Sequence, residues 1–403
     1  MTQLSIEEAQ RILLDSAVPI TQTEQCLLDD MVGRVAAEAV CAVYAQPPFD
    51  RSPLDGYALC SADIASATRD NPVQLSVSAH IFSEPCPPLE LTAGCAARIT
   101  TGGAIPAGAD CVVQQERTDY GEETVSIFTS LPSGRNICRK GEDLSVGEII
   151  VKPATRLTPA HIGLLAGQGI LSILVYRQPH VTVISTGNEV LQPGSSLTPG
   201  AVFDCNGPYL GARLRQLSST VCRQHVPDDS QLLSAALQQA LECSDIVITS
   251  GGASVGPRDL LPSVAADLGL RLLFDRVDVK PGGHMQAYAG NGSLLLCVSG
   301  NPFAAAITTE LFAVPLLLHM AGCSNYTPRR DTLTFQGSYP KASQKRQMLR
   351  AFAADGIVSF PCKNHHSGTL VGLSDCNCII DIAPGTPPLQ GGEKVLVIFF
   401  ERI

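Results

Sequence analysis

Residues 246–256 read Ile-Val-Ile-Thr-Ser-Gly-Gly-Ala-Ser-Val-Gly, and this stretch decides the fold. The run Ile246–Thr249 predicts a buried strand, because it is short, β-branched and followed at once by turn residues. The apolar spacing over 260–268 then predicts a helix. A strand, a small-residue loop and a helix form the unit from which parallel sheets are assembled.

The same alternation continues on both sides of this unit, over residues 176–324. It predicts further strands at 181–184, 220–225, 272–276 and 294–298, and further helices at 208–217, 230–241 and 302–320, the last with Asn301 as N-cap. Strands that alternate with helices predict a doubly wound, mostly parallel sheet.

The flanking regions follow other patterns. Short β-like runs at 73–81, 96–100, 111–115 and 124–128 predict a small β module over 46–134. Residues 1–40 have helical spacing, and a strand at 148–151 and a helix at 159–166 capped by Thr158 are predicted further on. We therefore expect a mixed α/β linker domain from 1–45 and 135–175, the α/β domain from 176–324, and a β-barrel-like domain from 325–403. The fold class is multidomain α/β plus β.

The composition excludes several classes of protein. The chain has 403 residues, 38 acidic against 28 basic, and a net charge of −10, which disfavours nucleic acid as a partner. Its 15 cysteines are scattered without a Cys-x-x-Cys pair, which favours free thiols in a reducing cytoplasm over a disulfide or zinc framework. The N-terminal stretch reads as an amphipathic helix rather than a signal peptide, and we expect no membrane span.

Polar residues follow the predicted strands at one edge of the sheet, where ligands bind in such folds. The carboxylates Glu189, Asp228 and Asp259 come after three of these strands, and hard oxygen ligands beside phosphate oxygens suit Mg²⁺. The loops 250–256 and 299–302 open helices, so their backbone N–H groups can converge on a phosphate. Ordinary caps and turns would explain any single loop, but their repetition at successive strand ends favours a site.

Three other segments attract attention. Arg276 and the stretch Lys280–His284 could pair with an oxyanion, although a solvated basic edge is the common alternative. The proline-rich segment 47–57 displays Asp55, and the glycine-rich segment 100–110 begins at Thr100-Thr101. Structural turns would explain both segments, and a role in the α/β site would need domain folding or a second subunit. A Ser/His hydrolase is disfavoured, since the eight histidines are scattered and the adjacent pair His365-His366 has no evident acid partner.

At these segments the chain resembles the molybdopterin molybdenumtransferase family (MoeA and the gephyrin E domain), over nearly its full length. The resemblance is carried by the following segments: 48–52, 55–58, 101–110, 115–116, 134–137, 140–143, 185–189, 248–256, 280–282 and 300–302.

The resemblance implies an elongated four-domain subunit, usually a homodimer, with the active cleft shared between subunits. It implies that adenylated molybdopterin and molybdate give molybdenum cofactor and AMP with a divalent cation, Mg²⁺, after an upstream molybdopterin adenylyltransferase has made the substrate. The catalytic set is then Asp55, Thr101, Asp143, Glu189, Asp228 and Asp259, with Glu189, Asp228 and Asp259 as metal ligands. The substrate-binding set is Ser250, Gly251, Gly252, Ser254, Arg276, Lys280, Gly300, Asn301 and Pro302. Arg350 and Ser367 match the positions at which the family holds molybdate.

The chain departs from the family pattern at a few places. Ser299 stands where the family usually has proline, and Gly283 and His284 stand where lysine and proline are frequent. Pro53 and Leu54 replace a small residue and methionine. These changes leave a second hypothesis open, namely that the chain is a divergent pterin-binding or scaffolding paralogue without catalytic activity. The full acidic set favours the enzyme.

Overall fold

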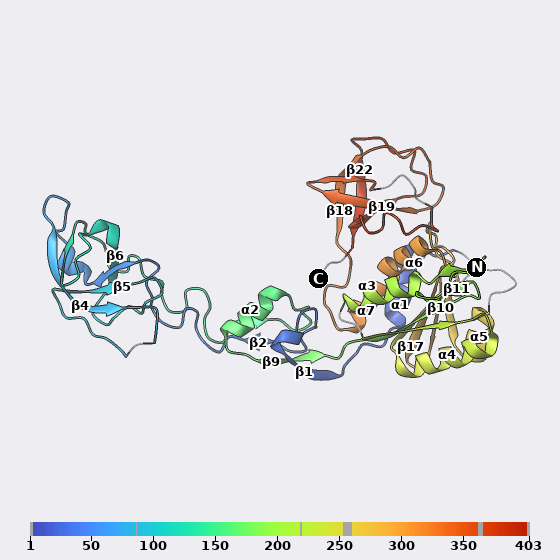
Figure 1. Ribbon diagram of the computed structural model, residues 1–403, viewed down its shortest axis with the longest axis horizontal. Coiled ribbons are helices and arrows are strands. Elements are labelled where there is room, and N and C mark those ends of the chain that lie inside the picture. The colour runs from blue at the N-terminus through green and yellow to red at the C-terminus, as the bar shows by residue number, and fades with distance from the viewer. Residues whose placement is uncertain (1–2, 86, 218–219, 253–259, 362–365, 401–403) are drawn as a thin grey trace. The chain divides into compact units, whose positions relative to one another are not determined.

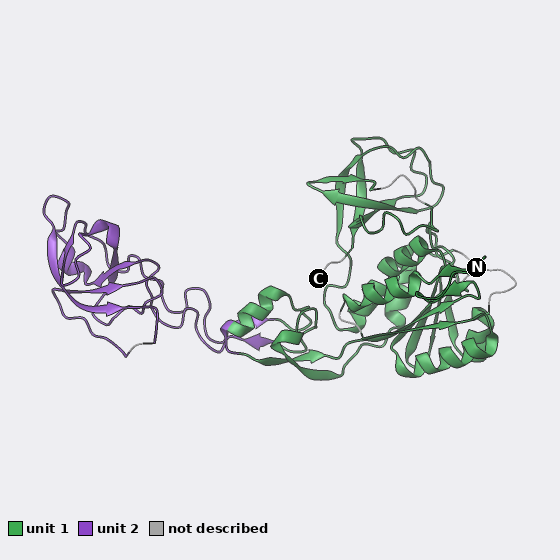
Figure 2. Ribbon diagram, in the orientation of Figure 1, with its two compact units in different colours: residues 1–38, 152–166, 170–403 green, residues 39–151, 167–169 purple. Residues whose placement is uncertain are grey.

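The structure of the protein is a computed structural model that describes residues 3–85, 87–217, 220–252, 260–361 and 366–400. The chain divides into two compact units, shown in Figure 2. Unit 1 holds residues 1–38, 152–166 and 170–403, and unit 2 holds residues 39–151 and 167–169. The division into four domains that the sequence analysis expects, with its boundaries, remains a prediction.

A six-stranded sheet forms the centre of unit 1 (Figure 1). In spatial order its strands are β13 (Thr220–Val226), β10 (His180–Thr186), β14 (Ile246–Ser250), β17 (Ser293–Val298), β16 (Gln286–Gly290) and β15 (Arg271–Phe274). The first four are parallel, whereas β16 is antiparallel to both of its neighbours. The predicted mostly parallel sheet is confirmed. Strand β16 was not predicted, because Gln286-Ala-Tyr-Ala-Gly290 has neither a β-branched run nor a regular alternation.

Helices cover both faces of this sheet (Figure 1). One face packs against α1 (Ile6–Ser16), α3 (Asn206–Arg215), α6 (Pro302–Thr308) and α7 (Val314–Met320), and the other packs against α4 (Ser230–Cys243) and α5 (Leu261–Asp267). Within β14, Ile246 and Ile248 belong to the first core and Val247 to the second. This alternation follows from the two-residue repeat of a strand, and it makes the sheet doubly wound as predicted.

The predicted helix 302–320 is present, with an irregular turn at its middle. A π-helical turn at Thr309–Ala313 joins α6 to α7, and Asn301 occupies the N-cap position without a side-chain cap hydrogen bond. The turn carries Glu310, whose carboxylate accepts hydrogen bonds of 2.6 and 2.9 Å from the buried guanidinium of Arg213 on α3. By length and hydropathy the span Pro302–Met320 could cross a membrane, but 94% of its window is buried inside the protein, as in a core helix of a globular domain.

The expectation of helix throughout residues 1–40 is wrong beyond α1. Strand β1 (Thr23–Leu27) pairs antiparallel with β9 (Ser172–Tyr176), and a 3-10 turn follows at Leu28–Asp30. Four of the five β1 residues are exposed, so its apolar spacing is weak, and pairing with a distant strand decides its conformation. The predicted helix α2 (Pro159–Gly167) is present, and the Thr158 hydroxyl lies 2.8 Å from the ring of His161.

Unit 2 contains the small β module. Its five-stranded sheet has the order β6 (Cys111–Gln114), β3 (Gly56–Leu59), β5 (Cys95–Ile99), β4 (Val73–Ile81) and β7 (Thr124–Ile127), with 3-10 turns at Ser61–Ile64 and Gln115–Arg117. The four predicted strands are confirmed. In the same unit, β2 (Val40–Cys41) pairs antiparallel with β8 (Ile149–Val151), where the chain enters and leaves the unit.

The C-terminal part of unit 1 is a closed barrel, which confirms the barrel-like prediction. Its order is β18 (Arg330–Gln336), β20 (Ile357–Ser359), β19 (Gln347–Ala354), β21 (Cys378–Ile382) and β22 (Lys394–Phe399).

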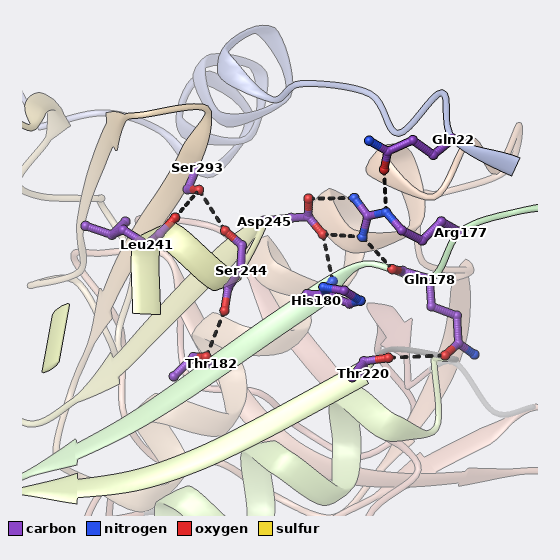
Figure 3. A network of polar contacts seen from close by, with 10 residues as sticks. All are labelled: Gln22, Arg177, Gln178, His180, Thr182, Thr220, Leu241, Ser244, Asp245 and Ser293. Atoms are coloured by element: carbon purple, nitrogen blue, oxygen red, sulfur yellow. Dashed lines mark hydrogen bonds and ion pairs between the residues drawn. The ribbon is translucent and has the colours of Figure 1, made fainter. Parts of the chain in front are cut away.

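A polar network ties the amino-terminal edge of the central sheet together (Figure 3). The Asp245 carboxylate accepts a bidentate pair of 2.9 Å bonds from Arg177 and a 2.7 Å bond from the His180 amide. Burial acts to raise the pKa of Asp245, but the hydrogen bonds from Arg177 and His180 outweigh it and hold the pKa below its usual value.

We expect Asp245→Asn to lower the free energy of unfolding by about 2 kcal/mol at pH 7, because the variant leaves Arg177 without its ion pair. A carboxylate with a lowered pKa stabilises the fold above its unfolded pKa of about 3.9 and loses that contribution as the pH falls through the folded value. Urea unfolding of both proteins from pH 7 downward should therefore show the difference shrinking below about pH 4. A difference that is constant with pH would contradict this assignment.

Candidate active site

Small-residue loops meet at the carboxyl edge of the sheet, where β10, β14 and β17 end. Gly251 has a φ of +100°, and a Cβ there would lie 2.6 Å from the carbonyl oxygen of Thr186. A Cβ on Gly300 would lie 3.6 Å from the Cα of Gly251, so the loops after β14 and β17 lie side by side. At Gly251 only glycine allows this close approach to the Thr186 backbone.

Two buried side chains that the sequence analysis did not single out hold these loops together. Asn206, which begins α3, donates 2.8 Å hydrogen bonds to the Ser250 hydroxyl and to the Gly300 carbonyl. Asp204 accepts 2.7 Å from the Ser185 hydroxyl and 2.9 Å from the Gly207 amide. The available signal was an Asp-x-Asn sequence at the start of a helix, in a doubly wound fold.

We expect Asn206→Ala to lower activity about tenfold and stability by about 1–2 kcal/mol, because the Ser250 and Gly300 oxygens lose a buried donor. Asn377 is a matched control, since its amide bonds both backbone groups of Ala353 in the barrel, away from the loops. Asn377→Ala should reduce the free energy of unfolding by a similar amount and leave the rate unchanged. Equal losses of rate in the two variants would contradict a positioning role for Asn206.

Two of the three predicted metal ligands lie on turns that are bonded to each other through Asn188. The Asn188 amide donates to the Asp228 carboxylate at 3.3 Å, and the Asp228 amide donates to the Asn188 side chain at 3.1 Å. Glu189 follows Asn188 directly and is exposed, as is Asp228. The neighbouring Asp229 instead caps α4 through the Gln231 and Leu232 amides.

Asp259 and Ser254 lie outside the described residues. Among the residues that are described, no three His, Cys, Asp or Glu side chains gather as a ligand set. Glu189 and Asp228 alone still fit Mg²⁺, which is usually held by one or two carboxylates together with substrate phosphates and water. The donor chemistry therefore suits this ion.

A broad groove of about 1620 Å³ opens beside these loops, between them and the barrel. Arg276 and Lys280 line it from the α/β part, and Lys341 and Lys345 line it from the barrel. No Asp or Glu lines the groove among the described residues. In a chain with a net charge of −10, a surface lined only by cations and neutral groups attracts anions.

The two predicted molybdate residues lie at different depths, and of the two only Ser367 lines this groove. Ser367 lines the groove, and its carbonyl accepts 2.9 Å from the Phe303 amide at the start of α6. Arg350 is fully buried beneath the same loop, where it donates to the carbonyl oxygens of His366, Thr369 and Val371. Its guanidinium also packs on the Phe303 ring, 4.3 Å from the ring centre. Arg350 thus supports the loop that presents Ser367.

The remaining substrate residues also fall on this edge. Ser299 and Asn301 line the groove, and the Ser299 hydroxyl accepts 3.1 Å from the Asn301 amide. Pro302 begins α6 immediately after them, and Gly252 lies near Thr186.

Three predicted catalytic residues belong to unit 2. The Asp55 carboxylate accepts hydrogen bonds from the Thr101 amide at 2.6 Å and the Thr101 hydroxyl at 2.8 Å. These bonds, the amide bond foremost, hold the pKa of Asp55 below its usual value. Asp143 is exposed, and its amide donates to Gln46. Asp55 therefore stays ionised and oriented by Thr101.

The chain is therefore an α/β protein whose doubly wound sheet meets a cation-lined groove at its carboxyl edge, with an appended barrel and β module. Comparisons with known proteins agree. Residues 4–169 match the MoeA N-terminal region (domain I and II), residues 182–319 a probable molybdopterin binding domain, and residues 332–400 the MoeA C-terminal region (domain IV). The chain belongs to the molybdopterin molybdenumtransferase family, a family of transferases of molybdenum cofactor biosynthesis.

Two curated relatives carry the family name. The Staphylococcus epidermidis molybdopterin molybdenumtransferase is 32% identical over 99% of this chain and 96% of its own length. The Bacillus subtilis molybdopterin molybdenumtransferase is 34% identical over 94% of this chain and 90% of its own length. The crystal structure of the molybdopterin biosynthesis moeA protein from Pyrococcus horikoshii superposes with a TM-score of 0.84 at 27% identity, covering 99% of this chain and all of that one.

Proposed function

We propose that this chain inserts molybdate into adenylated molybdopterin and releases AMP, in a reaction that depends on Mg²⁺. The observation that carries the proposal is the groove of Arg276, Lys280, Lys341 and Lys345, which has no carboxylate among its described lining residues. Both substrates are anions, and their mutual repulsion opposes the reaction unless cations offset it. At about 1620 Å³ the groove has room for more than a tetrahedral oxyanion.

The residues divide into two groups by charge. Lys280 and Arg276 offset the charge of molybdate, which Ser367 helps to orient at the barrel end. Glu189, Asp228 and Asp259 hold Mg²⁺, which when bound supplies positive charge to the diphosphate. The Gly251-Gly252 and Gly300 loops, with Ser250, Ser254, Asn301 and Pro302, bind the phosphate and pterin edges through backbone and hydroxyl groups.

The catalytic residues of unit 2 act from a second copy of the chain. We infer a homodimer in which Asp55, Thr101 and Asp143 of one subunit complete the cleft of the other. The Thr101 bonds to Asp55 keep that carboxylate ionised and oriented for this purpose. The enzyme works in the cytoplasm and receives its substrate from a molybdopterin adenylyltransferase.

Mixed dimers test the shared cleft. Asp55→Ala and Glu189→Ala homodimers should each be inactive, but a 1:1 mixture should recover about a quarter of wild-type activity. Half of the dimers are then mixed, and each mixed dimer has one intact cleft out of two. Activity measured after subunit exchange that stays at zero would show that the two residues act within one chain.

The function itself is tested by AMP release from adenylated molybdopterin with and without molybdate. Molybdate-dependent AMP release supports the proposal. AMP release at the same rate with and without molybdate would indicate hydrolysis of the diphosphate. Substrate binding without AMP release, in the presence of Mg²⁺, would indicate the non-catalytic paralogue.

A further inference from the structure

The segment that carries Lys280 is held like a strand between two other parts of unit 1. On one side Val277 forms a parallel bridge with Leu4, and the Asp278 amide donates to the Leu4 carbonyl at 2.7 Å. The Gln3 side chain adds a 3.1 Å bond to the Val277 carbonyl. The position of this segment therefore depends on the residues just before α1.

On the other side the segment is paired with the start of β19 in the barrel. The Lys280 amide donates to the Arg346 carbonyl at 2.9 Å, and the Met348 amide donates to the Lys280 carbonyl at 2.8 Å. Lys280 and Gln347 form a parallel bridge between these bonds. Lys280 reaches the groove from a backbone that the barrel fixes.

The side chain of Arg346 joins these two sides. Its Nη1 donates to both carboxylate oxygens of Glu7, at 2.7 and 2.8 Å, and Glu7 lies in the first turn of α1, three residues after Leu4. Its Nε and Nη2 donate to the two oxygens of Asp381 on β21, at 2.8 and 2.6 Å. We call this arrangement the Arg346 bridge. It closes a ring from Lys280 through Leu4, α1 and Arg346 back to Lys280.

The Arg346 bridge is shielded from solvent on its barrel side. The Arg346 side chain is 16% exposed and that of Asp381 only 2%, whereas that of Glu7 is 52% exposed. The hydrogen bonds that Arg346 donates to the Asp381 and Glu7 carboxylates outweigh burial and raise the pKa of Arg346, so the guanidinium is always charged. Arg346 itself does not line the groove. Any effect it has on an anion there must pass through the residues it positions.

We propose that Arg346 is a positioning residue of the anion groove, which sets the place of Lys280 by tying α1 to the barrel. The inference rests on the proposed function only in that Lys280 binds the anion. Lysine cannot replace Arg346, because a single ammonium does not serve two carboxylates with the geometry of a planar fork.

Amide hydrogen exchange tests the positioning without any ligand. In Arg346→Lys and in the milder Glu7→Gln, the Lys280 and Met348 amides should exchange about tenfold faster, because local opening of their bridge becomes easier. Arg177→Lys is the matched control, since it weakens another bidentate pair of unit 1 at the amino-terminal sheet edge (Figure 3) and should leave these two amides unchanged. Unchanged exchange in Arg346→Lys and Glu7→Gln, or equal acceleration in the control, would overturn the proposal.

Calorimetric binding of molybdate tests the consequence. Glu7→Gln should weaken molybdate binding about fivefold in the wild-type background and have no further effect in a Lys280→Ala background, because the two residues act through one contact. A loss that persists in Lys280→Ala, or wild-type affinity in Glu7→Gln, would overturn the proposal. If the wild-type protein bound no molybdate, the proposed function would fail instead, and the exchange rates would still decide whether Arg346 positions Lys280.

Discussion

Lys280→Ala is expected to lower molybdate-dependent AMP release by about 100-fold, the loss typical for removing one charged donor from a site that stabilises an oxyanion. The reason lies in the groove, where Lys280 is one of two cations contributed by the α/β part of unit 1. Its backbone is fixed on both sides, so the point from which its side chain enters the groove is set. Lys280→Arg keeps the charge and should recover part of the rate.

Lys394→Ala provides the control for this substitution. Lys394 donates to the Thr334 hydroxyl on the barrel and does not line the groove. Its removal takes away the same charge from unit 1, so a general loss of positive potential would lower both rates. Equal rates for Lys280→Ala and the wild type would show that the groove does not hold the reacting anion.

Glu189→Ala is expected to fold normally and to lose activity by about 1000-fold, because we propose Glu189 as a ligand of Mg²⁺ and such a ligand supplies several kcal/mol of transition-state stabilisation. Glu189 is exposed, so its side chain contributes little to the core. The adjacent Asn188 stays bonded to Asp228, which preserves the turn. The thermal midpoint and the Mg²⁺ dependence of AMP release together measure this prediction, and higher Mg²⁺ should restore part of the rate.

Asp229→Asn is the matched control for loss of an acidic side chain at the same edge. Asparagine caps a helix as well as aspartate does, so α4 should keep its cap and the protein its activity. Wild-type turnover in Glu189→Ala would remove Glu189 from the mechanism. An equal loss of activity in Asp229→Asn would indicate that the negative potential at this edge of the sheet matters, rather than metal binding by Glu189.

The elements predicted well from sequence are those whose local pattern agrees with their surroundings. Strand β4 begins and ends where its alternation predicts, at Val73 and Ile81, and β14 follows from its β-branched run. Strand β1 has a weak pattern and is set by its distant partner β9, about which local spacing carries no information. Strand β16 instead forms a hairpin with the next strand, β17, through Asn291-Gly292, a local turn signal that the sequence analysis did not use.

The site residues also divide into those that the sequence could place and those that it could not. The glycines and carboxylates that follow strands could be placed at one edge, because parallel strands end together. Asp204 and Asn206 were missed because a polar residue before a helix is usually read as an exposed cap, yet here both are buried. The depth of Arg350 and the groove positions of Lys341 and Lys345 depend on how the barrel packs on the sheet, which no short motif encodes.

The pairing of β2 with β8 means that the chain departs from unit 1 and returns to it at neighbouring points. Within unit 1 the Ala154 amide donates to the Ala36 carbonyl at 2.8 Å, so the two ends of the excursion are already adjacent without unit 2. Unit 2 is therefore an inserted domain, and the contact between the two ends of unit 1 does not depend on it. The cation-lined groove of unit 1 and the Asp55–Thr101 pair of unit 2 therefore lie in separable modules, which can change independently during evolution.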